Sequence, residues 1–180
     1  MSLFVAVLFM LAVVSAFSII FWTLKNGISP MPTATKVKSE LLKIELTLIP
    51  GPIYELGSGW GTLTFALAKK YPSHQVVAYE TSLIPYLYCI LKQYFYPQPN
   101  LHFHRLDFFH ESLKEASLVI CYLYPEAMQL LKDKFNEELP SGCFVISNTF
   151  AINEWHPLKA YPVDDMYHTK LYLYRYEQFP

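Results

Sequence analysis

The sequence predicts an α/β protein, with a mainly parallel sheet of seven strands that ends in an antiparallel hairpin and is preceded by one transmembrane helix. Three observations predict this fold. Residues 1–24 contain no charged side chain, residues 51–147 alternate short apolar runs with helical patterns, and two strand-like runs with no helix between them follow. Strands that alternate with helices are joined by crossover connections, which place neighbouring strands in parallel.

The first 24 residues carry much of the apolar excess of the chain, which is 180 residues long, 53% hydrophobic and 16% charged. As a helix, residues 3–24 would extend about 33 Å, enough to cross a hydrocarbon core of about 30 Å. A cleaved signal peptide is the alternative, with Val14-Ser15-Ala16 as its cleavage site. Because no basic side chain precedes the apolar run, which continues to Trp22, we expect an uncleaved anchor.

The residues after the anchor predict its orientation and the domain boundaries. Lys25, Lys36 and Lys38 follow the apolar segment, and the positive-inside rule therefore predicts a single-pass membrane protein with its C-terminal domain in the cytoplasm. Gly27 and two prolines indicate a short linker. We expect a transmembrane anchor over residues 1–24, a linker over 25–32 and one domain over 33–180. The near balance of 14 basic and 15 acidic residues argues against nucleic acid as a partner.

The first half of the domain alternates helices and strands. Val37, Leu41 and Leu42 recur near helical spacing and predict an amphipathic helix. After Gly51 the pattern changes to short apolar runs separated by helical stretches, and Pro85 falls in a first helical turn, where proline is tolerated. In order, this half is predicted to hold a helix over 33–48, a strand over 53–56, a helix over 62–70, a strand over 75–79, a helix over 82–96 and a strand over 101–106.

The second half begins with a nearly continuous apolar run, which is typical of a strand buried on both faces of a parallel sheet. In the last run, Leu171 and Leu173 alternate with tyrosines at the period of two that a strand requires. In order, this half is predicted to hold a strand over 118–123, a helix over 126–138, a strand over 142–147 and a hairpin of strands over 159–163 and 170–176.

The segment Glu55-Leu56-Gly57-Ser58-Gly59-Trp60-Gly61 is a glycine-rich turn between a predicted strand and a predicted helix. Glycines permit the tight turn and let the backbone approach a ligand at the carboxyl end of the strand, where open α/β sheets bind ligands. Glu80 ends the next strand, where an acid can accept hydrogen bonds from both hydroxyls of a ribose. The arrangement predicts a nucleoside-containing ligand.

Two departures from the dinucleotide fingerprint argue against NAD as that ligand. Thr62 occupies the place of the third glycine, and Glu55 would repel a pyrophosphate. An acid at this position suits a ligand with a cationic amino group, as in the methionine part of S-adenosylmethionine. No lysine follows the loop in the Walker fashion, which argues against a nucleoside triphosphate.

With these motifs, the chain resembles the Rossmann-like class I, seven-β-strand S-adenosylmethionine-dependent methyltransferases over residues 33–180. A narrower resemblance is to the small membrane-anchored protein-lysine methyltransferases related to the ATP synthase c-subunit lysine methyltransferase and its archaeal relatives. It is carried by residues 54–61, Ala78-Tyr79-Glu80, Leu106-Asp107-Phe108-Phe109 and residues 119–125.

The resemblance implies roles for particular residues. The glycines shape the loop under the cofactor, Glu55 organises its amino-acid end, Glu80 holds the ribose, and Asp107 and Phe108 receive the adenine. The implied cofactor-binding residues are Glu55, Gly57, Ser58, Gly59, Gly61, Glu80, Asp107 and Phe108, and the residues implied at the substrate opening are Tyr124, Pro125 and Glu126. No metal site is expected, because His102 and His104 alternate on one strand without a third ligand nearby.

We therefore expect a membrane-anchored methyltransferase that uses S-adenosyl-L-methionine and transfers the methyl group in line to a protein lysine, with membrane proteins favoured as substrates by the anchor. Two alternatives remain open. One is methylation of a lipid headgroup or a small amine, and the other is a non-catalytic adenosyl-nucleotide-binding scaffold at the membrane. The intact glycines and Glu80 argue against the scaffold.

Overall fold

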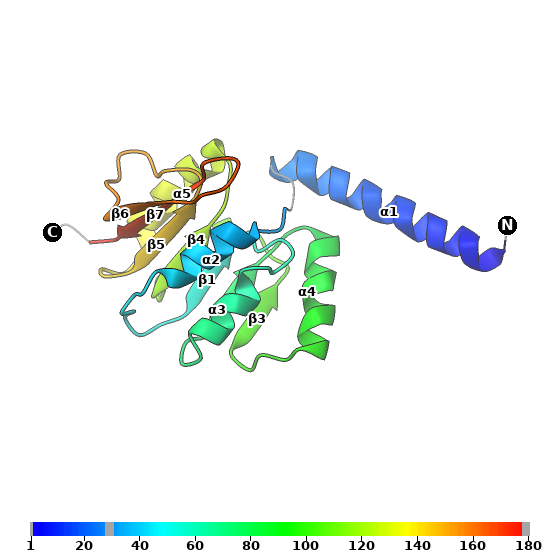
Figure 1. Ribbon diagram of the computed structural model, residues 1–180, viewed down its shortest axis with the longest axis horizontal. Coiled ribbons are helices and arrows are strands. Elements are labelled where there is room, and N and C mark those ends of the chain that lie inside the picture. The colour runs from blue at the N-terminus through cyan, green and yellow to red at the C-terminus, as the bar shows by residue number, and fades with distance from the viewer. Residues whose placement is uncertain (1, 28–30, 178–180) are drawn as a thin grey trace.

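The computed structural model describes residues 2–27 and 31–177, and it has one long helix that projects from an α/β domain (Figure 1). This helix, α1 (Leu3–Asn26), is long and apolar enough to cross a membrane, a property that a signal sequence near the N-terminus shares. Residues 3–25 contain no buried side chain. The Thr23 hydroxyl donates a hydrogen bond to the Ile19 carbonyl at 2.8 Å, which satisfies a polar group inside an apolar segment.

The predicted seven-stranded sheet is confirmed, with strand order β3-β2-β1-β4-β5-β7-β6. The strands β1 to β5 are parallel, and the C-terminal hairpin pairs antiparallel to β5 through β7. The order reverses between β1 and β4, which creates the switch point at which open sheets bind ligands. The strands are β1 (Ile53–Leu56), β2 (Val76–Tyr79), β3 (Leu101–His104), β4 (Leu118–Cys121), β5 (Phe144–Asn148), β6 (Lys159–Pro162) and β7 (Lys170–Arg175).

Two hydrophobic clusters cover the two faces of the sheet. One contains Val37, Leu41 and Leu67 from the helices before and after β1, and the other contains Leu131 and Phe135 from the helix after β4. The domain is therefore a three-layer sandwich. Its helices are α2 (Thr35–Lys43), α3 (Thr64–Lys70), α4 (Leu83–Phe95) and α5 (Pro125–Glu138), with a short 3₁₀ helix η1 (Phe108–His110) after β3.

Three predicted elements end two or more residues earlier in the structure. The strands β3 and β4 end at His104 and Cys121, two residues earlier than expected, because the parallel pairing with their neighbours stops there. The helix α2 ends at Lys43, since Ile44 takes an extended conformation. Of the predicted linker, Lys25 and Asn26 belong to α1, and residues 28–30 lie outside the described residues.

The helix α4 is held against the glycine-rich loop by a close contact. A Cβ atom at Gly61, whose φ is +65°, would lie 2.8 Å from Cys89 Sγ, and Cys89 is fully buried. The Cys89 thiol also donates to the Gly59 carbonyl at 3.4 Å. Gly61 is therefore required for packing α4 against the loop.

We predict that Gly61→Ala destabilises the protein by about 2 kcal/mol, because alanine is strained at positive φ and its Cβ overlaps Cys89. The measurement is denaturant unfolding of the full chain in detergent. The double variant Gly61→Ala/Cys89→Ala should lose less stability than the sum of the two single variants, since only the clash is relieved. Additive losses would show that the contact has no energetic weight.

Candidate functional site

The five parallel strands end at one level at the carboxyl edge of the sheet. The register pairs Leu56 with both Tyr79 and Cys121, and Tyr79 with His104. The loops that follow these strands meet at the switch point, where they line a cavity of about 300 Å³. Its lining residues are Lys25, Met31, Gly57, Gly59, Tyr79, Glu80, Thr81, Ser82, Asp107, Phe108, Phe109, Tyr122, Leu123, Tyr124 and Ala127.

The loop after β1 forms one wall of this cavity. Gly57 and Gly59 have φ values of +77° and +51°, and a Cβ at Gly59 would meet nothing closer than the Met31 carbonyl oxygen at 3.9 Å. Between them, Ser58 is buried, and its hydroxyl has no hydrogen-bond partner among the described residues. Open space beside the backbone and an unpaired buried hydroxyl are the features expected where a ligand approaches the loop.

Glu80 joins this loop to the loop after β2. Its Oε2 accepts a hydrogen bond from the Gly59 amide and its Oε1 accepts one from the Ser82 amide, both at 2.7 Å. The side chain is buried and lines the cavity. Each carboxylate oxygen can accept a further hydrogen bond, so Glu80 is held in place to receive two neighbouring hydroxyls.

The segment after β3 supplies an acid and two aromatic rings. Asp107 Oδ1 accepts a hydrogen bond from the Phe109 amide at 3.0 Å and thereby caps η1. The rings of Phe108 and Phe109 lie 4.6 Å apart, and all three residues line the cavity. Tyr79 adds a ring from β2. An acid beside aromatic surfaces suits an adenine, which has an amino donor and a flat apolar face.

Glu55 lies beside a different cavity, of about 30 Å³, which Ser58 and Asn148 also line. The Thr64 hydroxyl donates a hydrogen bond to Glu55 Oε2. Burial, with a smaller contribution from the charge of Glu80, raises the pKa of Glu55 to about 8, against the lowering effect of the Thr64 hydroxyl. The Glu55 carboxyl is therefore mostly protonated at neutral pH, and a cation placed nearby would favour its ionised form.

The residues after β4 lie where the end of α1 meets the domain. Tyr122 and Tyr124 line the cavity, whereas Pro125 and Glu126 are exposed on the first turn of α5 and are not among the described residues that line it. A Cβ at Gly27, the C-cap of α1, would lie 3.0 Å from Tyr124 Cζ. The C-terminal end of α1 thus reaches the cavity.

Several lining residues were not predicted from the sequence. Thr81, Ser82 and Phe109 directly follow predicted site residues, so extending each strand-end motif by one or two positions would have found them. Lys25 and Met31 belong to the predicted linker, and no local signal places them at the cavity. Gly61, which was also predicted at the cofactor loop, has close packing against Cys89 as an additional structural role.

His102 and His104, which alternate on β3, contact protein side chains in the structure. The His102 ring nitrogen Nε2 lies 2.6 Å from Gln75 Oε1, and the His104 ring lies 5.8 Å from the ring of Tyr79. Across residues 2–27 and 31–177, no group of three or more histidine, cysteine, aspartate or glutamate side chains is placed to bind a metal ion.

The residues around the cavity fit S-adenosylmethionine. Open space beside Gly59 leaves room for the cofactor along the loop, and the unpaired Ser58 hydroxyl lies with Glu55 at the smaller cavity. Glu80 offers acceptor positions for a ribose, and Asp107 beside Phe108 offers an acceptor and a ring for an adenine. On the other side of the loop, the buried Glu55 carboxyl would ionise when a cationic amino group is placed beside it.

Comparisons with known proteins agree with this geometry. Residues 55–159 match the family model of the ANTKMT methyltransferase domain. The chain is 32% identical over 112 residues to the mouse adenine nucleotide translocase lysine N-methyltransferase, covering 61% of this chain and 48% of that protein. It is 30% identical over 149 residues to a protein-lysine N-methyltransferase of Saccharolobus islandicus, covering 80% of this chain and 91% of that protein.

The same architecture occurs in a solved methyltransferase. The crystal structure of an RNA methyltransferase from Salinibacter ruber in complex with S-adenosyl-L-homocysteine superposes with a TM-score of 0.70, at 22% identity, over 83% of this chain and 96% of that chain. At this identity the likeness establishes the fold.

The family match covers more than half of the chain and includes the glycine-rich loop, Glu80, Asp107 and the residues after β4. The chain spans about half the length of the mouse relative and nearly all of the archaeal one. This protein therefore belongs to the ANTKMT methyltransferase family and is an S-adenosylmethionine-dependent methyltransferase.

Proposed function

We propose that this protein is a membrane-anchored protein-lysine N-methyltransferase. The observation that supports it most directly is that α1 ends against the cavity, with Gly27 packed on the ring of Tyr124. An anchor that ends at the cavity would bring the reacting methyl group close to the membrane surface. The two relatives described above are both named as lysine methyltransferases.

The chain's residues perform binding, orientation and exclusion of water. Bound S-adenosylmethionine supplies a methyl group on a sulfonium, which an amine attacks in line. Glu80, Asp107 and the glycine loop would hold the cofactor, with Glu55 at its amino-acid end, while Tyr122 and Tyr124 form the opening through which the amine enters. We infer that the reaction does not require a dedicated protein base, because the neutral amine attacks the methyl group by itself.

An acceptor lysine must lose its proton before it attacks. From a reference pKa near 10.4, presenting the neutral amine at pH 7.4 costs about 4 kcal/mol. The aromatic rings of Tyr122 and Tyr124 can first bind the ammonium over their faces and then exclude water, which lowers its pKa. Glu126 is exposed on α5 and Asp107 is assigned to the adenine, so the proton would leave to water before the opening closes over the amine.

The charges around α1 and the order of the segments support an orientation for the protein in the membrane. Lys25, Lys36 and Lys38 on the domain side of α1 support a cytoplasmic domain. Residues 1–24, 25–32 and 33–180 would then act as anchor, linker and catalytic domain, with Lys25 and Met31 of the linker also lining the cavity. A tether raises the effective concentration of an enzyme toward substrates in the same bilayer.

We infer that the substrate is a membrane protein. The mouse relative is named for an adenine nucleotide translocase, and the c subunit of ATP synthase, the substrate in the family that the sequence resembles, is a second candidate. Incubating the full chain with radiolabelled S-adenosylmethionine and membranes from cells that lack it should label lysine in a membrane protein. Label in extracted lipid would contradict protein methylation, and tight cofactor binding without any label would favour a scaffold.

Replacing Glu80 by alanine should weaken cofactor binding at least tenfold, because the loop loses the carboxylate that holds the Gly59 and Ser82 amides and the ribose loses its acceptor. Calorimetric titration of the full chain in detergent with S-adenosylhomocysteine measures the loss. The control is Glu137→Ala, an exposed acid on α5. Wild-type affinity in a folded Glu80→Ala protein would exclude Glu80 from the cofactor site.

The raised pKa of Glu55 predicts a pH-dependent stability. Between its unfolded value near 4.5 and its folded value of about 8, the folded protein keeps a proton that the unfolded chain releases. The free energy of unfolding should therefore fall as pH rises through this window, by at most about 1.4 kcal/mol per pH unit. Denaturant unfolding at pH 5.5 and 7.5 should show a smaller decline for Glu55→Gln, which cannot ionise. Equal declines would contradict the assignment.

Replacing Tyr124 by alanine should lower turnover on the membrane acceptor about tenfold while the affinity for S-adenosylhomocysteine stays within twofold. The reason is that the ring binds the acceptor ammonium and contacts Gly27, not the cofactor loop. Tyr161→Ala, which removes a half-buried ring on the edge strand β6, is the matched control. Unchanged turnover in Tyr124→Ala would remove Tyr124 from the opening.

A further inference from the structure

The helix α4 presents an apolar face to its surroundings. Leu87, Tyr88, Leu91, Tyr94 and Phe95, which we name the α4 face, are between 45% and 80% exposed. They are spaced i, i+1, i+4, i+7 and i+8, so they share one side of the helix. A continuous exposed apolar surface of this kind marks a binding face in a folded protein.

The polar side chains of α4 point toward the domain. Lys92, the one charged residue in its sequence, places Nζ 4.3 Å over the ring of Phe65 on α3. Gln93 donates hydrogen bonds to the carbonyls of Gln98 and Leu101. A helix exposed to water has the opposite arrangement, with charged groups outward and apolar groups inward. The partner of the α4 face is therefore apolar.

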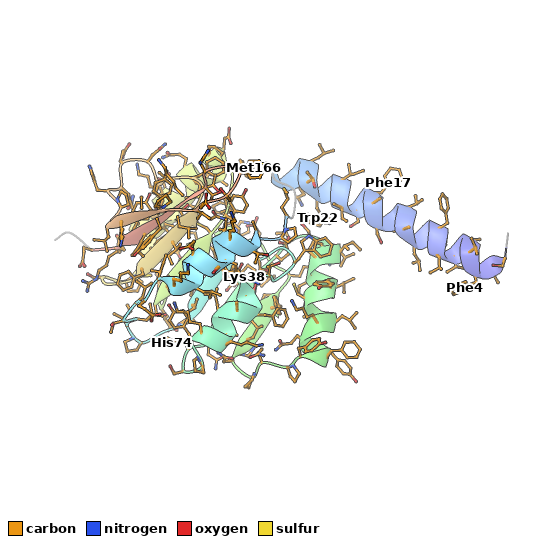
Figure 2. All side chains as sticks on the ribbon, viewed as in Figure 1. Phe4, Phe17, Trp22, Lys38, His74 and Met166 are labelled. Atoms are coloured by element: carbon orange, nitrogen blue, oxygen red, sulfur yellow. The ribbon has the colours of Figure 1, made fainter. Side chains whose placement is uncertain are left out.

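The end of α1 lies beside α4. Figure 1 shows α1 leaving the domain above one end of α4, which runs away from α1 at a steep angle, and Figure 2 shows Trp22 at this junction. Two cations surround the Trp22 ring: Lys25 Nζ at 4.8 Å and Arg105 Cζ, from the loop after β3, at 5.9 Å. Tryptophan beside basic residues is typical of the boundary between hydrocarbon and headgroups.

We propose that the α4 face is a second membrane contact, which lies in the interfacial layer of the leaflet from which α1 emerges. This inference rests on α1 spanning the bilayer, as in the proposed function. A lipid surface fits better than a protein partner, because the face is continuous with the membrane end of α1 and because Lys25 and Arg105 match anionic headgroups.

The two contacts together determine how the domain sits on the bilayer. A single helix would let the domain turn about its linker, whereas α1 and the α4 face hold one edge of the sheet, the β3 edge, against the surface. Because Gly27 contacts Tyr124, the opening of the cavity then lies within a short distance of the headgroups. The site would accept lysines in the interfacial layer and exclude lysines far from the membrane.

Fluorescence quenching with single labels tests the contact. All three native cysteines are buried, and burial raises the pKa of each thiol to about 12, so a thiol-reactive nitrobenzoxadiazole probe should label an introduced cysteine. The positions are Leu91→Cys on the α4 face, Phe17→Cys within α1, and Leu158→Cys before β6 at the opposite edge of the sheet. Leu91 and Leu158 are similarly exposed, at 57% and 62%.

The labelled full chain is reconstituted in vesicles of phosphatidylcholine and phosphatidylglycerol. We expect the probes at Leu91 and Phe17 to be quenched by spin-labelled lipid and to be at least fivefold less sensitive to iodide than the probe at Leu158. A Leu91 probe as open to iodide as the Leu158 probe, with Phe17 protected, would overturn the α4 contact and leave the anchor intact. A Leu91 probe shielded from both quenchers would overturn it in favour of a protein partner.

A Phe17 probe open to iodide would contradict the anchor, and the α4 inference with it.

Activity provides a second measurement. The double variant Leu91→Ser/Tyr94→Ser should methylate a membrane acceptor at least fivefold more slowly than wild type, with unchanged affinity for S-adenosylhomocysteine as evidence of folding. Leu158→Ser is the control. Wild-type rates in the double variant would overturn the role of the contact in catalysis.

Discussion

The carboxylate of Glu80 joins the two loops that form one side of the cavity. It accepts hydrogen bonds from the amides of Gly59 and Ser82, which belong to two different loops, and it does so in a buried place where these bonds are strong. Without it, both amides would lose a partner. The open space beside Gly59 and the position of the Ser58 hydroxyl both depend on this loop, so the shape of the cavity depends on one side chain.

Glu80 also affects the second acid of the site. Its charge adds to the burial that raises the pKa of Glu55, on the other side of the same loop. The two acids therefore differ in environment: Glu80 has two amide donors and lines the main cavity, whereas Glu55 accepts from the Thr64 hydroxyl beside the smaller cavity. A cation beside the loop would favour ionised Glu55, so the cofactor's amino group can replace a proton that the free protein keeps.

The order of strands and helices, the glycine loop and Glu80 could be predicted because periodicity and strand-end motifs are local. Strand ends were predicted two residues late after β3 and β4, since apolar runs continue past the point where pairing stops. The packing role of Gly61 could not be predicted, because a glycine pattern does not distinguish the approach of a ligand from the approach of a side chain, here Cys89. Lys25 and Met31 reach the cavity only through the tertiary placement of α1, which no local pattern encodes.

The exposed apolar surface of this protein extends from α1 to the α4 face, and this second surface adds orientation to the proposed anchor. A flexible tether would raise the concentration of the domain near the bilayer without orienting it, and any lysine within its reach could react. Here α1 packs beside α4, and its C-cap contacts Tyr124 at the cavity. Movement of the domain relative to the bilayer would have to break these contacts or lift the α4 face into water. In the membrane arrangement that we propose, the same surfaces would restrict which lysines can enter, so substrate selection would not need to depend on the sequence around the lysine.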